Sequence, residues 1–227
     1  MLRGMQTLED PVEVPVEGRV EGGVEDPVAT FYRHLAPAYD LIYGVILHPG
    51  RRAAIRRMGL ASGTRVLEVG AGTGLSAVMY PPECDVLAVD FSREMLTRAE
   101  ARLSRRGITN VRLMEADATR LRLDSEQFDV VYAPYLINVV SDPLSVAREM
   151  RRVCRPGGRV VFLNHFRGDN AASGWLDDTL DRLVMAKAGV RWNLAMKPLL
   201  RAASLELLSV KKVNVPRFSS LAVCRPA

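Results

Sequence analysis

The feature that most constrains the fold is a run of alternate glycines that directly follows a short apolar stretch. The stretch is Arg65–Val69, and Gly70, Gly72 and Gly74 come after it. Glycine tolerates positive φ and lets another group approach the backbone closely. A tight turn from a strand into a helix does not need three alternate glycines. The pattern therefore predicts a buried strand that ends in a ligand-binding turn, as at the carboxyl edge of an open α/β sheet.

The chain after this turn alternates strand-like and helix-like patterns. Short β-branched runs indicate buried parallel strands, at Arg65–Val69, Val86–Val89, Val111–Met114, Phe128–Tyr132 and Arg159–Leu163. Helical spacing lies between them, at Gly74–Met79, Arg93–Arg106 and Leu144–Val153. Two more strand patterns follow near the end, at Ser209–Val215 and Phe218–Cys224. This rhythm predicts an α/β fold, a doubly wound seven-stranded sheet with right-handed crossovers.

Composition divides the chain into three parts. Residues 1–27 repeat valine, glutamate, glycine and proline without a period, which predicts a disordered acidic tail. Residues 28–60 carry apolar positions at helical spacing, which predicts N-terminal amphipathic helices beside the site. Residues 61–227 are predicted to form the sheet domain. A helical insertion at about 170–204, after the fifth strand, is expected to cover the carboxyl-end cleft as a lid.

Charge and composition limit the kinds of partner that the chain is expected to bind. Residues 1–29 hold two arginines against seven acidic residues, so the rest of the chain carries +10 within a total of +5. A basic body favours a phosphate-bearing substrate, an anionic membrane or nucleic acid. Three cysteines and three histidines are scattered, so we expect neither disulfides nor a metal site. No run approaches the roughly 18 apolar residues of a membrane span, and the first residues lack the apolar run typical of a secretory signal. We expect a cytoplasmic protein.

Further motifs accompany the glycine turn in a fixed order. They are Val86–Asp90, Glu115–Ala118, Phe128–Ala133 and Arg155–Arg159. The Gly-x-Gly-x-Gly spacing after Glu68 differs from the Gly-x-Gly-x-x-Gly of nicotinamide enzymes. Together, over roughly residues 64–163, these motifs resemble those of class I S-adenosylmethionine-dependent methyltransferases. The resemblance implies a Rossmann-like methyltransferase sheet, with S-adenosylmethionine as cofactor and S-adenosylhomocysteine as product.

The resemblance assigns a set of residues to the cofactor. They are Tyr39, Glu68, Gly70, Ala71, Gly72, Gly74, Asp90, Phe91, Met95, Asp117, Ala118 and Ala133. Asp90 would accept hydrogen bonds from both ribose hydroxyls, each worth about 1.5–3 kcal/mol. Asp117 would bond the adenine amino group, while Phe91 and Met95 would line the adenine slot. Two plainer alternatives stay open, because Met95 also suits an ordinary core and Asp117 a solvated loop.

The acceptor side is indicated by Tyr39-Asp40-Leu41-Ile42-Tyr43-Gly44. This run resembles the element over the cofactor in phosphoethanolamine and phospholipid N-methyltransferases and in quinone-ring methyltransferases. By that resemblance Tyr39 lies near the sulfonium, where its ring would stabilise a methylated ammonium by about 0.5–2 kcal/mol. Its hydroxyl could also accept a proton. Tyr43 either contacts the substrate or packs beneath the lid.

The segment after the fourth strand completes the expected catalytic set. The fourth-strand motif of the family delivers residues beside the transferable methyl, which here points to Tyr135 and Asn138. Related amine methyltransferases often carry a histidine near this place, and the sequence departs from that pattern at Asn138. An asparagine cannot act as a base, although its carbonyl oxygen could orient an amine. We expect Tyr39, Tyr135 and Asn138 to be catalytic.

Polar residues just past the fifth strand suggest a site for the substrate phosphate. In phosphobase methyltransferases a polar side chain at this point contacts that phosphate, which here points to His165 and Arg167. Arginine would hold it through a bidentate fork. A capping or solvated histidine is the alternative. Tyr32 and Tyr43 complete the expected substrate-binding set.

The whole chain most resembles the bacterial phospholipid N-methyltransferases. The resemblance implies stepwise methylation of phosphatidylethanolamine towards phosphatidylcholine. An apolar face within 28–35, with arginines nearby, predicts peripheral binding to the anionic inner face of the cytoplasmic membrane. A methyltransferase of quinones or other small apolar molecules stays open. An RNA methyltransferase is disfavoured by few aromatic residues and no recognisable RNA-binding module, and a non-catalytic scaffold by the intact glycine turn.

Overall fold

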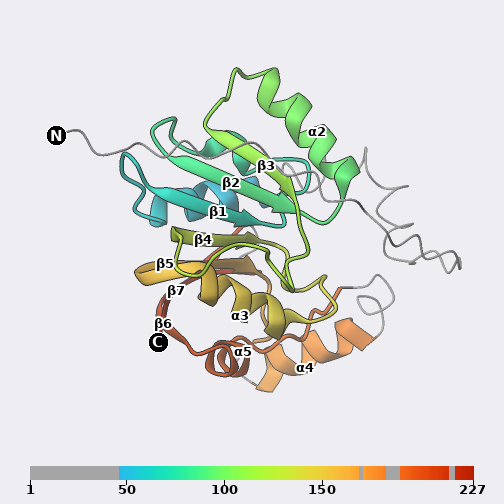
Figure 1. The fold of residues 1–227 in the computed structure, drawn as a ribbon. Helices are drawn as coiled ribbons and strands as arrows, with labels where there is room; N and C mark the ends of the chain where they lie inside the picture. Colours follow the sequence, from blue (N-terminus) through green and yellow to red (C-terminus); the bar gives the residue numbers. More distant parts are fainter. Residues whose placement is uncertain (1–45, 169–170, 183–189, 215–217) are drawn as a thin grey trace, which may run out of the picture.

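The computed structural model describes residues 46–168, 171–182, 190–214 and 218–227. They contain a seven-stranded sheet in the order β3-β2-β1-β4-β5-β7-β6 (Figure 1). The strands are β1 (Arg65–Val69), β2 (Asp85–Asp90), β3 (Val111–Glu115), β4 (Phe128–Pro134), β5 (Cys154–Asn164), β6 (Leu205–Val213) and β7 (Ser219–Pro226). β1 to β5 are parallel, whereas β7 runs antiparallel to β5 and β6. The predicted doubly wound sheet is confirmed, with its strand order reversing between β1 and β4.

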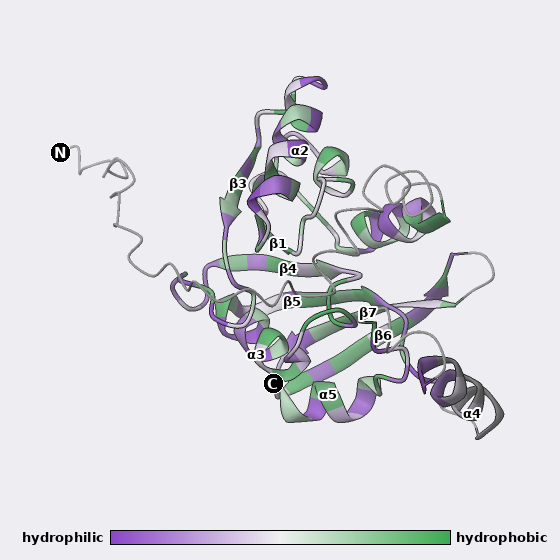
Figure 2. Cartoon of the chain, turned by 90° about the vertical axis from the view of Figure 1, so that its right-hand side faces the viewer, coloured by the Kyte–Doolittle hydropathy of each residue, from purple (hydrophilic) through white to green (hydrophobic). Residues whose placement is uncertain are grey.

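Helices cover both faces of the sheet. They are η1 (Ala77–Met79), α2 (Arg93–Ser104), α3 (Pro143–Val153), α4 (Ala171–Leu180), α5 (Met196–Ala202) and a helix over residues 46–57. Met150 of α3 and Leu199 of α5 share one buried cluster with Leu67 of β1. Ala54 of helix 46–57 shares another with Val66, its neighbour on β1. Figure 2 shows apolar residues along the central strands and mixed polarity on the helices.

Two helices begin at the carboxyl edge of the sheet because their caps lie there. The Ser92 hydroxyl, just after β2, accepts a hydrogen bond from the Met95 amide and starts α2. Asp142 accepts from the amides of Leu144 and Ser145 and starts α3, with a proline in its first turn. Such caps satisfy amides that have no partner inside the helix. They also fix the turns that border the cleft.

The structure corrects several of the predicted boundaries. Only Ala77–Met79 of the helix predicted over Gly74–Met79 is helical, because Gly74 adopts a φ of +76°. α5 ends at Ala202, and Ser204, with a φ of +53°, turns the chain straight into β6. β6 therefore begins at Leu205 rather than Ser209. A register shift between Leu207 and Ser209 interrupts the alternation that sequence patterns depend on.

The predicted insertion at about 170–204 contains α4 and α5 within the described residues. The predicted acidic tail, residues 1–27, and most of the predicted N-terminal helices lie outside them. Among the described helices, not one combines the length and the apolar character needed to cross a membrane.

Candidate active site

The glycine turn after β1 is held against β2. The amides of Gly70 and Ala71 both donate to the Val89 carbonyl, at 2.8 and 2.9 Å. Gly70 has a φ of +78°, and a Cβ there would lie 2.8 Å from a methyl carbon of Leu136. Gly72 also has positive φ, +54°, but a Cβ there would meet nothing within 4 Å. Gly70 is thus required by close packing, whereas the backbone at Gly72 faces open space that a ligand can approach.

Asp90 lies beside this turn at the end of β2. One carboxylate oxygen accepts from the Gly72 amide at 2.7 Å, and the other accepts from the Ser92 amide at 2.9 Å. Burial raises the pKa of Asp90 from its ordinary value, while these amides act to lower it. Each oxygen retains a lone pair for a further donor. The carboxylate is therefore positioned to accept two hydroxyl groups of a ligand.

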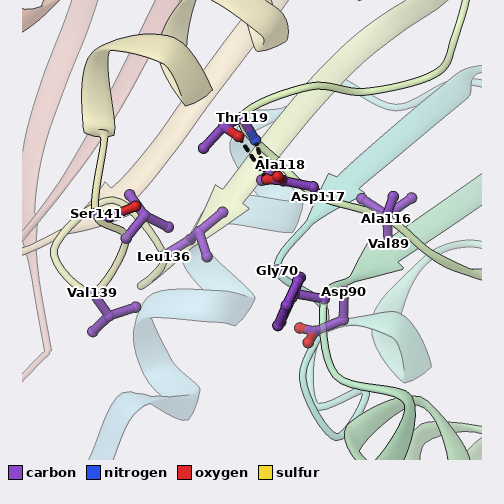
Figure 3. Close-up of a pocket in the computed structure, with 12 residues that line it drawn as sticks. Gly70, Val89, Asp90, Ala116, Asp117, Ala118, Thr119, Leu136, Val139 and Ser141 are labelled. Atoms are coloured by element: carbon purple, nitrogen blue, oxygen red, sulfur yellow. Dashed lines mark hydrogen bonds between the residues drawn. The ribbon is translucent and has the colours of Figure 1, made fainter. Parts of the chain in front are cut away.

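A cavity of about 360 Å³ opens at this switch point (Figure 3). Its lining consists of residues 70, 89–91, 116–119, 136 and 139–141. One oxygen of Asp117 accepts from the amide and hydroxyl of Thr119, at 2.8 and 2.7 Å, and the other is left for a ligand. The size suits a small-molecule site. Ligands of open α/β sheets bind at this position, outside the carboxyl ends of the strands.

The cavity brings together part of the predicted cofactor set. Gly70, Asp90, Phe91, Asp117 and Ala118 line it, and Phe91 is 78% exposed. The sequence interpretation did not single out the lining that follows β4, which includes Leu136 and residues 139–141. In the sequence, only their position after a strand at the switch point indicates that these residues could line a ligand site.

Other predicted cofactor residues lie away from the cavity. Gly74 packs against α2, where an added Cβ would lie 3.0 Å from the Cβ of Ala99. Met95 is half-buried on α2, and Ala133 is fully buried in β4. These positions are not part of the cavity lining. Gly74 and Ala133 support the turn and the sheet through packing, and the core alternative for Met95 stays open.

Glu68 lies beneath the turn rather than in the cavity. It is fully buried, and burial raises its pKa from 4.5 to about 7, although the hydroxyls of Tyr80 and Ser76 and the charge of Arg51 lower it. Neither carboxylate oxygen makes a hydrogen bond of normal geometry with the described residues. Glu68 is paired in register with Tyr132 on β4, which is also fully buried. The buried carboxyl group therefore packs beneath the turn, and its ionisation in the folded chain is costly.

Tyr135, a predicted catalytic residue, links three elements. It follows β4 with a φ of +59°, a conformation that a residue other than glycine adopts only when its surroundings hold it there. Its hydroxyl donates to the Leu47 carbonyl at 3.2 Å and accepts from the Asn214 side chain at 2.9 Å. Burial raises its pKa, so the phenol keeps its proton. This network ties helix 46–57 and the end of β6 to β4.

Asn138 is also engaged by its neighbours. Its side-chain NH₂ donates to the Arg191 carbonyl, and its oxygen accepts from the Asn164 side chain at 2.7 Å. The Asn138 side chain is 4% exposed. Its expected role, orienting an amine through this oxygen, has to compete with the bond to Asn164.

The two predicted phosphate ligands both lie next to acids of α4, but only Arg167 is hydrogen-bonded to its acid. His165 bonds the Phe218 carbonyl through Nδ1 at 2.8 Å, its Nε2 lies 3.2 Å from Asp177, and burial lowers its pKa. Arg167 makes a bidentate pair with Asp178, at 2.9 and 2.7 Å. These partners lie on the insertion, so no local pattern indicated them.

The His165 ring also stacks on Trp192, with ring centroids 4.0 Å apart. This contact joins the end of β5 to the segment before α5. The remaining predicted residues, Tyr32, Tyr39 and Tyr43, lie outside the described residues. Within the described ranges, we find no group of three or more histidine, cysteine or acidic side chains that could hold a metal.

The fold and the site define a nucleoside-binding α/β enzyme. A family model described as a methyltransferase domain matches residues 67–162. A phosphatidylethanolamine N-methyltransferase of Cereibacter sphaeroides is 40% identical over 158 residues, 69% of this chain and 77% of that protein. A ubiquinone/menaquinone biosynthesis C-methyltransferase of Azotobacter vinelandii is 32% identical over 171 residues, 71% of this chain and 68% of that one.

Solved structures share the fold at lower identity. Phosphoethanolamine N-methyltransferase 2 of Haemonchus contortus, in complex with S-adenosylmethionine, aligns with a TM-score of 0.68 and 22% identity over 86% of this chain and 48% of that one. The [4+2]-cyclase SpnF aligns with a TM-score of 0.70 and 20% identity over 88% of this chain and 95% of that one. The fold by itself therefore does not fix the reaction.

The chain belongs to the class I S-adenosylmethionine-dependent methyltransferases. Its cofactor is S-adenosylmethionine. The residues present fit this molecule: the open backbone at Gly72 admits it, and the doubly anchored Asp90 suits its ribose diol.

Proposed function

We propose that this methyltransferase transfers methyl groups to the amine of phosphatidylethanolamine, stepwise towards phosphatidylcholine, at a membrane surface. The observation that carries the proposal is the 40% identity to a phosphatidylethanolamine N-methyltransferase. That match covers 158 residues, whereas the general methyltransferase domain covers only residues 67–162. The relatedness therefore extends beyond the part of the chain that binds the cofactor.

Methyl transfer to an amine depends more on how the two reactants are oriented than on a strong acid or base. When bound, S-adenosylmethionine supplies an electrophilic methyl group on its sulfonium. The residues of this chain must hold a neutral amine in line with that methyl and exclude water. Because Tyr135 keeps its proton and its hydroxyl is engaged, we assign it to shaping the site. Tyr39 is the proposed contact to the amine, and its hydroxyl or a water molecule is the proposed proton acceptor.

The proposed phosphate site lies at the end of β5. The pair between Arg167 and Asp178 uses Nε and Nη2 of the guanidinium, which leaves Nη1 for another acceptor. A phosphodiester would share or displace Asp178, and the cost of that exchange would be offset by a second charged pair. His165 would contribute only if it exchanged Asp177 for the phosphate. Tyr32 and Tyr43 are the proposed contacts to the rest of the head group.

Membrane association is proposed for the N-terminal side of the molecule. Helix 46–57 presents Arg52, Arg56 and Arg57 to solvent. Each cation near an anionic bilayer adds about 1 kcal/mol to binding. The amphipathic stretch over residues 28–35 precedes this helix and would insert its apolar face beside these charges.

A quinone methyltransferase is the second candidate function. The specific observation in its favour is the 32% identity to the Azotobacter enzyme over 68% of that protein.

The experiment that separates the two supplies each acceptor alone. The full chain is incubated with methyl-labelled cofactor and phosphatidylglycerol vesicles that contain either phosphatidylethanolamine or a demethylated menaquinone. We expect label in mono-, di- and trimethylated phosphatidylethanolamine. Asp90→Asn serves as the inactive control. Label in the quinone but not in the phospholipid would overturn the proposal.

A further inference from the structure

The cavity accounts for only part of the cofactor. If Asp90 and Asp117 hold its ribose and adenine, the methionine part extends from Asp90 past Gly70, away from Asp117. Gly70 packs against Leu136, which also lines the cavity, and Tyr135 directly precedes Leu136 in the chain. The methionine part is a zwitterion with one ammonium and one carboxylate. A buried carboxylate requires a charged or strongly polar partner.

Arg51 is the only arginine or lysine in the described ranges that is buried, at 8% exposure. The three other arginines of helix 46–57 are exposed, so this helix turns one cation inward and the rest outward. The guanidinium carbon of Arg51 lies 4.8 Å from the centre of the Tyr135 ring. Its guanidinium group therefore faces the turn after β4, which borders the glycine turn.

The helix is fixed in this position near Arg51. The Tyr135 hydroxyl donates to the Leu47 carbonyl, and the Gly50 amide donates to the Asn214 side chain at 2.8 Å. A Cβ on Gly50 would lie 2.5 Å from the Tyr135 hydroxyl. Helix and turn are thus in close contact, and Arg51 directly follows the contact residue. A preorganised cation of this kind binds a ligand with little loss of conformational freedom.

The charges around the turn are arranged as a zwitterion requires. The field of Arg51 lowers the pKa of Glu68 beneath the turn, and Asp90 acts on Glu68 in the opposite direction. Asp90 therefore lies beside the turn as a carboxylate, and Arg51 lies on the helix side as a cation, whereas ionisation of the buried Glu68 is costly. An ammonium is favoured near Asp90 and a carboxylate near Arg51.

We propose that Arg51 is a cofactor-binding residue that holds the α-carboxylate of the methionine part of S-adenosylmethionine. A guanidinium offers two parallel N–H donors that match a carboxylate. This role separates Arg51 from Arg52, Arg56 and Arg57, which we assign to the membrane. The inference depends on the cofactor alone and holds whether the acceptor is a phospholipid or a quinone.

The test compares two ligands that differ only in the carboxylate. S-adenosylmethionine and its decarboxylated form are titrated calorimetrically into the full chain without any acceptor. We expect Arg51→Gln to weaken S-adenosylmethionine by about 10- to 100-fold, the range expected for a lost charged hydrogen bond. Its affinity for the decarboxylated ligand should match that of the unaltered protein. Arg52→Gln is the matched control on the same helix and should change neither affinity.

Equal weakening of both ligands by Arg51→Gln would overturn the inference, because it would mean a structural role only. An unchanged affinity for S-adenosylmethionine would overturn it as well. Arg51→Lys keeps the charge and covers the case in which Arg51→Gln does not fold. It should still prefer the ligand with the carboxylate, and equal binding of the two ligands would contradict the proposal.

Discussion

The two sides of the cleft use their polar groups differently. On the cofactor side, Asp90 and Asp117 accept from nearby amides and keep capacity for a ligand. On the proposed acceptor side, the side chains of Asn138 and Arg167 are hydrogen-bonded to other side chains, and His165 Nε2 lies 3.2 Å from Asp177 of α4. The cofactor side is therefore preformed, whereas ligand binding on the acceptor side requires an exchange of partners. A preformed cofactor site beside groups that must exchange partners fits a family whose members are named for different acceptors.

The largest expected effect comes from breaking the cofactor side. Asp90→Ala removes the two charged hydrogen bonds that we propose to the ribose, so the affinity for S-adenosylhomocysteine should fall by about 100-fold or more. Calorimetric titration of the folded variant measures it. Asp85→Asn, at the exposed first residue of the same strand, is the control and should leave the affinity unchanged. An Asp90→Ala affinity within a few-fold of normal would show that the ribose binds elsewhere.

The local character of the cofactor side also explains why it was predictable. The turn, Asp90 and Ser92 are close in sequence, and each follows a strand whose pattern is plain. Two pairs of the proposed acceptor side span long separations, 79 residues from Tyr135 to Asn214 and 26 from Asn138 to Asn164, and the partner of Arg167 lies on the insertion. No periodicity reports such contacts. The sequence therefore predicted the sheet and the cofactor, but not the partners of the acceptor residues.

The second largest effect concerns the buried carboxyl group beneath the turn. Glu68 keeps its proton to about pH 7 in the folded chain, whereas the unfolded chain loses it near 4.5. The folded state binds more protons between these values, so the free energy of unfolding should fall as pH rises from about 5 to 8, by roughly 3 kcal/mol.

Denaturant unfolding at several pH values measures this dependence. Glu68→Gln cannot ionise and should flatten it. Glu100→Gln on the exposed side of α2 should keep the slope. A slope that survives in Glu68→Gln would assign the dependence to another group.

A smaller effect is expected from the hydrogen bonds of the Tyr135 hydroxyl, which tie helix 46–57 and the end of β6 to β4. Tyr135→Phe removes a hydroxyl that bonds Leu47 and Asn214, which should cost about 1–2 kcal/mol of unfolding free energy. Tyr80→Phe is the comparison variant, because the buried Tyr80 hydroxyl lies close to Glu68 but makes no hydrogen bond of normal geometry. It should cost less. An unchanged free energy of unfolding for Tyr135→Phe in chemical denaturation would mean that the network adds no stability.

The smallest effect on stability is expected at the rim of the acceptor side. Arg167→Gln breaks a half-exposed ion pair with Asp178, and such pairs contribute little to folding. The variant should instead raise KM for phosphatidylethanolamine several-fold and leave KM for the cofactor unchanged. Asp178→Asn should lower KM for the phospholipid, because it frees the guanidinium. Steady-state kinetics on vesicles would contradict this if both variants behaved alike.

One calorimetric titration tests most directly whether the cofactor side binds its ligand independently of the acceptor side. S-adenosylhomocysteine is titrated into the unaltered chain and into the double variant His165→Asn, Arg167→Gln. The preformed cofactor site predicts the same Kd within about twofold, even though methyl transfer to phosphatidylethanolamine should fall. A Kd that rises tenfold or more in the double variant would show that the cofactor site depends on the acceptor side, and would contradict the account.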